Sequence, residues 1–401
     1  MKPFTIKDGI FWIGDIDYNS RDFHGYSRSP QGTTYNAYLV LDEKNVIFDT
    51  VKAEAADTML CRLGHIIPPE KVDYIVVNHV ELDHGGALPR LVEACKPEKI
   101  FCSPLGKKAL EGHFDITGWP VEVVKTGDVI SIGRRSVQFL EARMLHWPDS
   151  MFSYIPEEKM LISNDAFGQN IASSERYFDE MDGTLLDHCM KEYYHNIVQP
   201  YAPQVLKILD QIAELKLDVE ILAPDHGLIF RTREDVAWAL ESYRSYAASP
   251  WKKRAVIVYD SMWHSTEKMA EAIAEGLMDA GVPVRIMWTK ANHHSAIMTE
   301  LADCGAVIVG SPTHNNGILP TVAEILTYMK GLRPQNKIGA AFGSFGWSGE
   351  GPQAIHEWLG GMNFEMPADP LKFKFVPTHE DLKKCFDMGR GIAEALAAHC
   401  G

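Results

Sequence analysis

Long apolar runs are absent from this sequence of 401 residues. No stretch approaches the ~20 consecutive apolar residues of a membrane-spanning helix. The N-terminal stretch MKPFTIKDG also lacks the charged and apolar regions of a signal peptide. We therefore expect a cytoplasmic protein that has no membrane partner.

Paired cysteines, an excess of basic residues and phosphate-loop glycine motifs are also missing. The seven cysteines form no C-x-x-C pair, which excludes a fused rubredoxin or zinc ribbon and fits reduced thiols. The net charge of −15 argues against nucleic acid as a partner. The lack of G-x-G-x-x-G and G-x-x-x-x-G-K-[ST] weighs against a dinucleotide or a nucleoside triphosphate.

One short motif offers the first positive signal. The segment HVELDH, residues 79–84, follows an expected strand at 72–77 and precedes Gly85-Gly86. In an extended segment alternate residues point to the same side, so His79, Glu81 and Asp83 are expected to share one side. Imidazole and carboxylate ligands without a thiolate suit iron, manganese or zinc.

Three later strands are each followed closely by another potential ligand. The strands expected at 136–141, 160–163 and 219–222 lead to His146, Asp165 and His226. Loops at strand ends hold binding residues in fixed relative positions. The repetition of strand, short loop and ligand favours a metal site over a set of solvated polar loops.

The inventory of ligands is too large for one metal ion. About four protein ligands hold one ion, so four imidazoles and three carboxylates predict two ions that share a carboxylate. Asp165 is the expected bridge, because it is the lone ligand from its loop. We assign three further ligands to the first ion (His79, Glu81, His146) and three to the second (Asp83, His84, His226). Whether His84 is a ligand stays open, because its neighbour Asp83 restricts the direction in which it can point.

At this point the first half resembles the metallo-β-lactamase superfamily, whose loop usually reads H-x-H-x-D-H. Glu81 replaces the second histidine, and the form H-x-E-x-D-H is similar to that of the flavodiiron proteins, also called A-type flavoproteins. The resemblance implies an αββα sandwich. An anionic oxygen donor stabilises ferric iron, which favours redox chemistry over zinc hydrolysis.

The second half begins where SPWKKR, residues 249–254, ends a helical region, and we place the domain boundary so that residues 1–251 and 252–401 form two domains. Strands and helices then alternate about every fifteen residues. This alternation predicts a doubly wound, five-stranded parallel sheet, so the overall class is α/β.

Three loops in this half carry potential binding groups at the C-terminal ends of strands. The first is rich in hydroxyls at a helix N-terminus, and the third combines glycines with aromatic residues. This half resembles flavodoxin, which implies FMN. By that resemblance the first loop holds the phosphate and the other two flank the ring: Ser261, Met262, Trp263, His264, Ser265 and Thr266; Pro312, Thr313, His314, Asn315 and Asn316; Ser344, Phe345, Gly346, Trp347, Ser348 and Gly349.

The two halves together are similar to the rubredoxin-dependent oxidoreductases of anaerobic bacteria within the flavodiiron family. The resemblance implies FMN and two non-haem irons bridged by Asp165 and an oxo or hydroxo group. It further implies electrons from rubredoxin or a similar small carrier, reduction of O2 to water or NO to N2O, and a head-to-tail homodimer or dimer of dimers. Phe23, Tyr26 and Trp147 are expected to line the metal pocket, and His24 and Tyr193 to donate hydrogen bonds or protons.

Two other classes of protein remain open at this point. The first is a zinc hydrolase of the metallo-β-lactamase superfamily with an accessory flavodoxin domain. The second is an electron-transfer or sensor protein whose metal site does not turn over. The preference between O2 and NO also stays open, because both are small diatomic molecules.

Overall fold

A computed structural model of the chain describes residues 2–400. The chain divides into two compact units. The N-terminal unit comprises the residues up to Gly25, Ser29–Tyr194 and Tyr201–Ala247, and the C-terminal unit comprises Tyr26–Arg28, His195–Pro200 and the residues from Ala248 onward. None of the helices within residues 2–400 has the length and apolar character needed to cross a bilayer.

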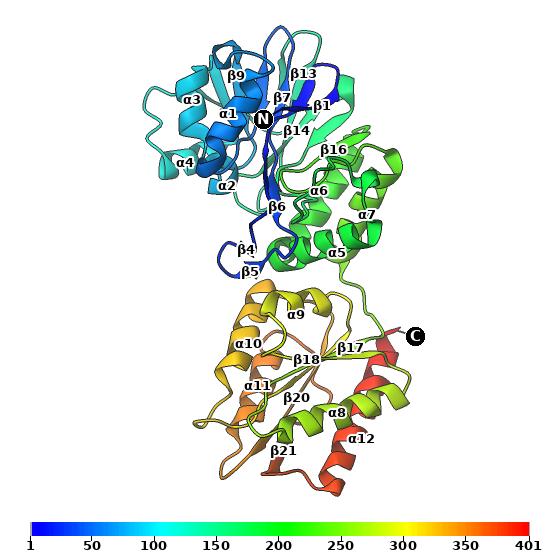
Figure 1. Cartoon of the computed structure of the whole chain (residues 1–401). Helices are drawn as coiled ribbons and strands as arrows, with labels where there is room; N and C mark the ends of the chain where they lie inside the picture. Colours follow the sequence, from blue (N-terminus) through cyan, green and yellow to red (C-terminus); the bar gives the residue numbers. More distant parts are fainter. Residues whose placement is uncertain (1, 401) are drawn as a thin grey trace. The chain divides into compact units, whose positions relative to one another are not determined.

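The N-terminal unit is built on two β-sheets (Figure 1). The first sheet has seven strands in the order β1 (Phe4–Lys7), β2 (Ile10–Trp12), β7 (Tyr38–Val40), β8 (Val46–Phe48), β9 (Tyr74–Val77), β10 (Lys99–Cys102) and β11 (Val121–Val123). The second has five, in the order β12 (Val129–Ser131), β13 (Ser136–Glu141), β14 (Met151–Ile155), β15 (Met160–Ile162) and β16 (Ile221–Ala223). Short strands lie between β2 and β7: β3 (Asp15–Asp17), β4 (Asp22–Phe23), β5 (Ser27–Arg28) and β6 (Thr33–Tyr35), of which β3 pairs with β6.

The two sheets pack face to face around one apolar core. Tyr38 and Val76 of the first sheet meet Phe139 and Ile162 of the second. Alternate residues such as Leu39 point to the outer face of the first sheet. That face is covered by α1 (Ala56–Gly64), α3 (Leu88–Cys95) and α4 (Pro104–His113), while α5 (Gly183–Tyr193), α6 (Ala202–Glu214) and α7 (Arg233–Ala248) lie on the other flank in Figure 1. This layering is the αββα sandwich that the resemblance implied.

The C-terminal unit contains the predicted five-stranded parallel sheet. The strand order is β18 (Val284–Trp288), β17 (Ala255–Tyr259), β19 (Ala306–Gly310), β20 (Ile338–Phe345) and β21 (Leu371–Lys374), and every pairing is parallel. Helices α8 (Ser265–Asp279) and α12 (His379–Cys400) cover one face, and α9 (His294–Leu301), α10 (Pro320–Leu332) and α11 (Glu350–Gly360) cover the other. The strand order reverses between β17 and β19, which is where ligands bind in such sheets.

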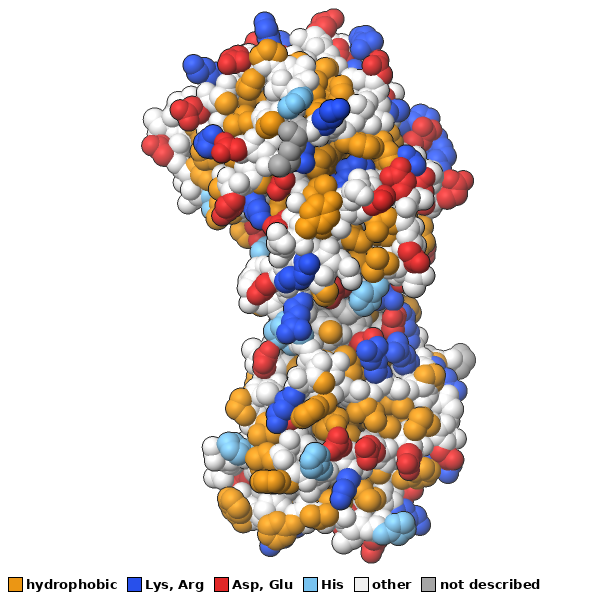
Figure 2. Space-filling model, viewed as in Figure 1, with side chains coloured by type: hydrophobic (Ala, Val, Ile, Leu, Met, Phe, Trp, Pro, Cys, Tyr) orange, Lys and Arg blue, Asp and Glu red, His pale blue; other side chains and the backbone are white. Residues whose placement is uncertain are grey.

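Local differences from the sequence predictions concern short helices. The segment expected to stay extended turns into α2 (Leu82–Gly85) halfway through the HVELDH motif. Helices α1 and α4, for which the sequence analysis gave no expectation, complete the outer layer before residue 170. On the face of the molecule in Figure 2, acidic and basic side chains are interspersed, although the net charge is −15.

A glycine at the contact between α8 and α12, with an exposed glycine of α12 as its control, yields a test of the fold. A Cβ at Gly276 of α8 would lie 2.0 Å from the Phe386 carbonyl oxygen of α12, whereas one at Gly391 of α12 would meet nothing within 4 Å. We expect Gly276→Ala to lower the free energy of unfolding by about 1–3 kcal/mol. Gly391→Ala should raise it by about 0.5–1 kcal/mol, because alanine favours helix. Urea titrations followed by circular dichroism measure both, and an unchanged stability of Gly276→Ala would contradict the packing.

Candidate functional site: a double metal centre and a flavin pocket

The HVELDH motif lies directly after β9, and a buried carboxylate on a distant loop fixes its first histidine. Asp149 Oδ2 accepts hydrogen bonds from His79 Nδ1 at 3.0 Å and from the Val80 backbone N–H at 2.7 Å. With Nδ1 engaged, His79 Nε2 is free to serve as a ligand. The sequence analysis missed Asp149, whose only local signal is its place three residues after His146 in the same loop.

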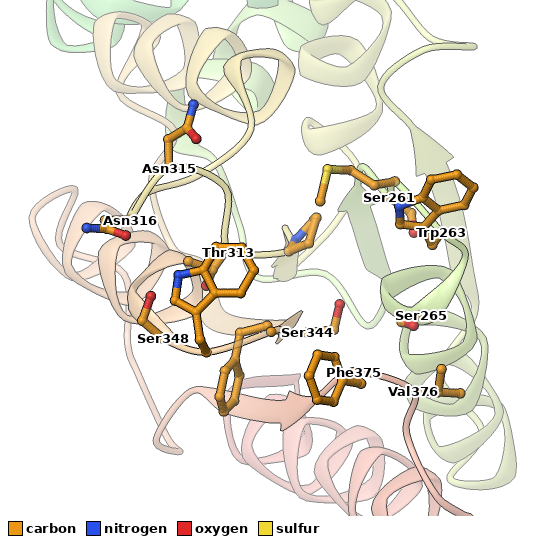
Figure 3. A pocket seen from close by; sticks show the side chains of 15 residues that line it. Ser261, Trp263, Ser265, Thr313, Asn315, Asn316, Ser344, Ser348, Phe375 and Val376 are labelled. Atoms are coloured by element: carbon orange, nitrogen blue, oxygen red, sulfur yellow. The ribbon is translucent and has the colours of Figure 1, made fainter.

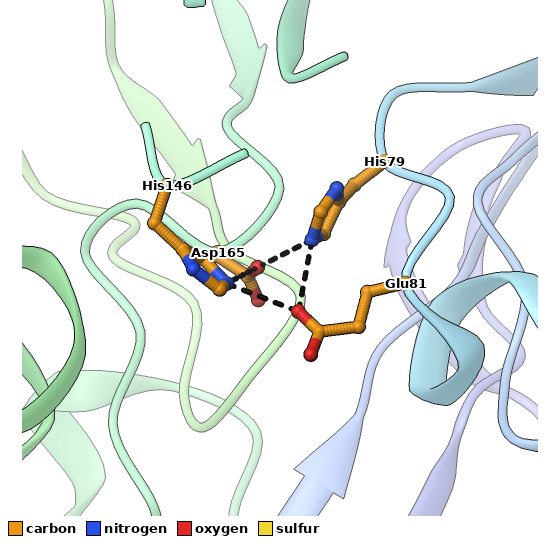
Figure 4. A group of neighbouring side chains, drawn as sticks. All are labelled: His79, Glu81, His146 and Asp165. Atoms are coloured by element: carbon orange, nitrogen blue, oxygen red, sulfur yellow. Dashed lines mark hydrogen bonds and ion pairs between the residues drawn. The ribbon is translucent and has the colours of Figure 1, made fainter. Parts of the chain in front are cut away.

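A first group of ligand atoms surrounds one point (Figure 4). Glu81 Oε2 lies 3.2 Å from His79 Nε2 and 3.1 Å from His146 Nε2. Asp165 Oδ2 lies 3.1 Å from each of the same two nitrogens. All four side chains lie within the N-terminal unit, and they are the ones assigned to the first ion.

A second group lies around the other oxygen of Asp165. His84 Nε2 lies 3.0 Å from His226 Nε2, and Asp165 Oδ1 lies 3.1 Å from the former and 3.2 Å from the latter. Asp83 Oδ2 lies 3.4 Å from His84 Nε2 and 3.3 Å from His226 Nε2. His84 therefore lies among the ligand atoms, because the turn into α2 directs it inward.

The two groups fit metal ions in their spacing. Two ligand atoms bound to one ion at about 2.1 Å lie about 3.0–3.4 Å apart for octahedral or tetrahedral angles. The observed separations, from 3.0 to 3.4 Å, fall in this range. The ring nitrogens of His84 and His226 point at each other, as two ligands of one cation would.

The electrostatics around the metal ligands also favour the binding of positive charge. Burial alone would lower the pKa of His146, but hydrogen bonding to Asp165 and Glu81 raises it to about 9. Burial of His226 is likewise outweighed by Asp165 and Asp83, which raise its pKa to about 10. The carboxylates thus attract cationic charge, which protons or metal ions supply.

The other residues predicted around the metal site have separate placements. His24 Nε2 lies 2.9 Å from Glu81 Oε1, and the Phe23 ring lies 5.3 Å from His226. The Trp147 ring lies 5.3 Å from that of His79, and the Tyr193 ring lies 5.6 Å from that of His226. Tyr26 is placed differently: its ring contacts Tyr328 at 5.9 Å, within the C-terminal unit.

A separate pocket of about 460 Å³ opens in the C-terminal unit (Figure 3). Its walls come from the loops that follow β17, β19 and β20 and from two residues after β21. Thirteen of its fifteen lining residues were predicted: Ser261, Met262, Trp263, Ser265, Pro312, Thr313, Asn315, Asn316, Ser344, Phe345, Gly346, Trp347 and Ser348. The other two, Phe375 and Val376, were missed because the sequence analysis did not locate the fifth strand.

Four residues predicted for the same pocket do not line it. Thr266 is buried behind it, with its Oγ1 3.5 Å from Ser344 Oγ, and the His264 ring faces Glu267 at 2.6 Å. His314 pairs through its backbone with Gly317, and Gly349 precedes α11. The set of residues predicted for the flavin pocket therefore includes a few that do not line it.

The shape of this pocket fits a flat aromatic ring with a phosphate. Trp263 and Trp347 are 85% and 89% exposed at its mouth, where they offer stacking faces. The backbone N–H groups at the start of α8 and the hydroxyls of Ser261 and Ser265 suit an anion. Beside the pocket, Gly343 allows the close approach of β20 to the end of β19, since a Cβ there would lie 1.8 Å from the Ser311 carbonyl oxygen.

Comparisons with known proteins agree with this division of the chain. The family described as "ODP family beta lactamase" matches residues 33–227, and the family described as "Flavodoxin" matches residues 257–389. The chain is 58% identical to a protein named rubredoxin-oxygen oxidoreductase from Megalodesulfovibrio gigas, with 99% of each chain covered.

Two further relatives extend the comparison. The chain is 43% identical to a protein named nitric oxide reductase from Moorella thermoacetica, with 99% of each chain covered. The crystal structure of the flavodiiron protein from Giardia intestinalis matches with a TM-score of 0.95 and 30% identity, covering 100% of this chain and 98% of that one. With both halves matched in the same order and over the full length of these relatives, the chain belongs to the flavodiiron protein family.

Proposed function

We propose that this protein is a flavodiiron oxidoreductase that takes electrons from a small carrier through FMN to a diiron site, where O2 is reduced to water or NO to N2O. The observation that carries the proposal is the pair of ligand groups sharing Asp165, with Glu81 as an anionic donor, in one chain with a flavin pocket. The names of the relatives support an oxidoreductase over a zinc hydrolase.

In this proposal the metal ligands divide as their geometry suggests. His79, Glu81 and His146 would hold one iron, and Asp83, His84 and His226 would hold the other, with Asp165 available to both. When bound, the two irons supply a site that binds a diatomic molecule and donates electrons to it. Asp149 orients His79, and the Thr34 carbonyl oxygen, 2.7 Å from His226 Nδ1, orients His226.

Side chains around this centre shape the space for the gas and hold protons. Phe23 and Trp147 present apolar rings beside the ligand histidines. Burial, reinforced by the charge of Asp165, raises the pKa of Tyr193 well above its usual value, so its hydroxyl keeps its proton. His24 is the second proposed donor, at Glu81 Oε1. Tyr26, which packs on Tyr328 in the C-terminal unit, is not part of this proposal.

FMN is proposed to occupy the pocket of the C-terminal unit. Ser261, Ser265 and the start of α8 would hold its phosphate, and Trp347 would lie near the ring. We further propose rubredoxin as the carrier, a head-to-tail homodimer in a cytoplasmic location, and a change of domain near residue 252. Such a dimer would place each flavin near the partner's irons, and the carrier would dock near the exposed tryptophans at the pocket mouth.

Replacing the shared carboxylate tests the metal assignment. We expect Asp165→Ala to lower bound iron by about tenfold or more, because both groups lose a ligand and a compensating charge. FMN content should not change. Elemental analysis and flavin absorbance measure the two, with Asp57→Ala, at a side chain that is 82% exposed, as the control. Retention of both irons would show that Asp165 is not the bridge.

The charge of Asp149 can be removed while its shape is kept. Asp149→Asn should weaken iron binding at the first position by about 10- to 100-fold, because His79 loses the partner that fixes its ring. Competition with a chelator, followed by iron analysis, gives the affinity. Equal iron affinity in Asp149→Asn and the unsubstituted protein would show that Asp149 does not contribute to the metal site.

The reaction itself is tested by rapid mixing of the fully reduced, iron- and FMN-loaded protein with O2 or NO. We expect the flavin and iron absorbances to return to their oxidised forms within seconds with at least one gas. A protein that stays reduced with both gases would be an electron-transfer or sensor protein. A preparation that holds zinc tightly and contains no iron would instead support the alternative function, a zinc hydrolase.

A further inference from the structure

We propose that four tyrosines of the N-terminal unit carry oxidising equivalents from the metal site to the protein surface: Tyr193, Tyr194, Tyr243 and Tyr246. The inference rests on the proposed function, because the reduction of O2 supplies the oxidant. Reduction of O2 to two waters needs four electrons. The path acts when O2 arrives while the protein holds fewer than four electrons, because oxidising equivalents then remain at the metal site.

The inner end of the path is Tyr193. Its ring centroid lies 5.6 Å from that of His226 and 6.2 Å from that of Phe23. A Cβ at Gly168, three residues after Asp165, would lie 3.2 Å from Tyr193 Cζ, so the phenol lies against the loop that carries the shared carboxylate. Tyr193 is therefore an oxidisable side chain in the immediate surroundings of the ligands.

The middle of the path is a set of buried rings in contact with one another. Tyr194 follows Tyr193 directly in the chain, and its ring lies 5.0 Å from Tyr243 and 5.1 Å from Tyr246. Tyr243 also lies 6.3 Å from Tyr246. Such spacings place Tyr194, Tyr243 and Tyr246 in van der Waals contact, where an electron transfers over a short distance, and Tyr193 is joined to them through its peptide bond to Tyr194.

The outer end is Tyr246, which is partly exposed. Its hydroxyl donates to Asp187 Oδ1 at 3.4 Å, and the Asp187 side chain is 44% exposed. A phenol that loses an electron becomes a strong acid, so it needs a nearby base. Asp187 supplies that base at a position open to water.

The chemistry of the four side chains argues against a role in packing alone. Tyr193, Tyr194 and Tyr243 are at most 1% exposed. Phenylalanine would fill nearly the same volume, but its ring lacks the phenol that can release an electron and a proton. Three buried phenols that lead to a fourth beside a surface carboxylate fit stepwise electron transfer.

The proposed step balances in electrons and protons. One electron leaves Tyr246 and passes through the buried tyrosines to the oxidant at the metal site, while the Tyr246 phenol proton moves to Asp187. Tyr246 becomes a neutral radical and Asp187 a carboxylic acid. A thiol in solution then gives a hydrogen atom to Tyr246, Asp187 releases its proton to water, and two thiyl radicals join as a disulfide.

The test uses the iron- and FMN-loaded protein reduced with only two electrons per chain. We expect rapid freezing after mixing with excess O2 to trap a tyrosyl radical, which electron paramagnetic resonance detects. The signal should narrow when the protein contains ring-deuterated tyrosine. In Tyr246→Phe the radical should stay on a buried tyrosine and decay several-fold more slowly in the presence of a small thiol. Peptide mass spectrometry should then show several-fold more oxidised residues.

Controls separate this path from other outcomes. Tyr154→Phe removes a phenol that donates to the Asp218 carbonyl oxygen at 2.9 Å outside the path, and it should behave like the unsubstituted protein. Protein carrying all four electrons should give no radical. Consumption of O2 without a tyrosyl radical, or a radical whose decay is the same in Tyr246→Phe, would overturn the path alone. If the protein does not react with O2, both the path and the proposed reduction of O2 on which it rests would be overturned.

Discussion

The shared carboxylate of Asp165 is the constraint on which the N-terminal unit depends. It is 2% exposed, and its two oxygens face different pairs of histidines. A buried carboxylate must be balanced by positive charge, which here comes from histidines on loops of both sheets or from the ions that they hold. The ligands meet only when the sandwich closes, so metal binding and folding of this unit are linked.

Much of this site could be predicted from the sequence, because each ligand lies on a loop or turn that follows a strand. The β-branched and aromatic residues before His79 and those before His146 mark their strands locally, and the sheet then places the loop. The contact of Asp149 with His79 could not be predicted in this way. It joins residues 70 positions apart, and no local pattern distinguishes Asp149 from a solvated loop carboxylate.

In the C-terminal unit the alternation of strands and helices was sufficient for the class of sheet and for most of the pocket, but not for the position of the fifth strand. Phe375 and Val376 were missed because LKFK, residues 371–374, is a short and partly exposed edge strand with two lysines. Tyr26 was placed at the metal site from its closeness to His24 in sequence. Gly25 separates the two with φ +75°, and the chain turns there, so that Tyr26 packs on Tyr328.

The short segments Tyr26–Arg28 and His195–Pro200 have a practical consequence for work with separate domains. Within the C-terminal unit, Asn196 Nδ2 donates to Thr299 Oγ1 at 3.1 Å, and the Tyr328 hydroxyl donates to Asn196 Oδ1 at 2.9 Å. The Arg28 backbone N–H donates to Ser295 Oγ at 3.3 Å. A gene fragment that starts near residue 252 would omit both segments and leave α9 and α10 without these partners. The flavin half is therefore a spatial unit that no single cut of the chain can excise whole.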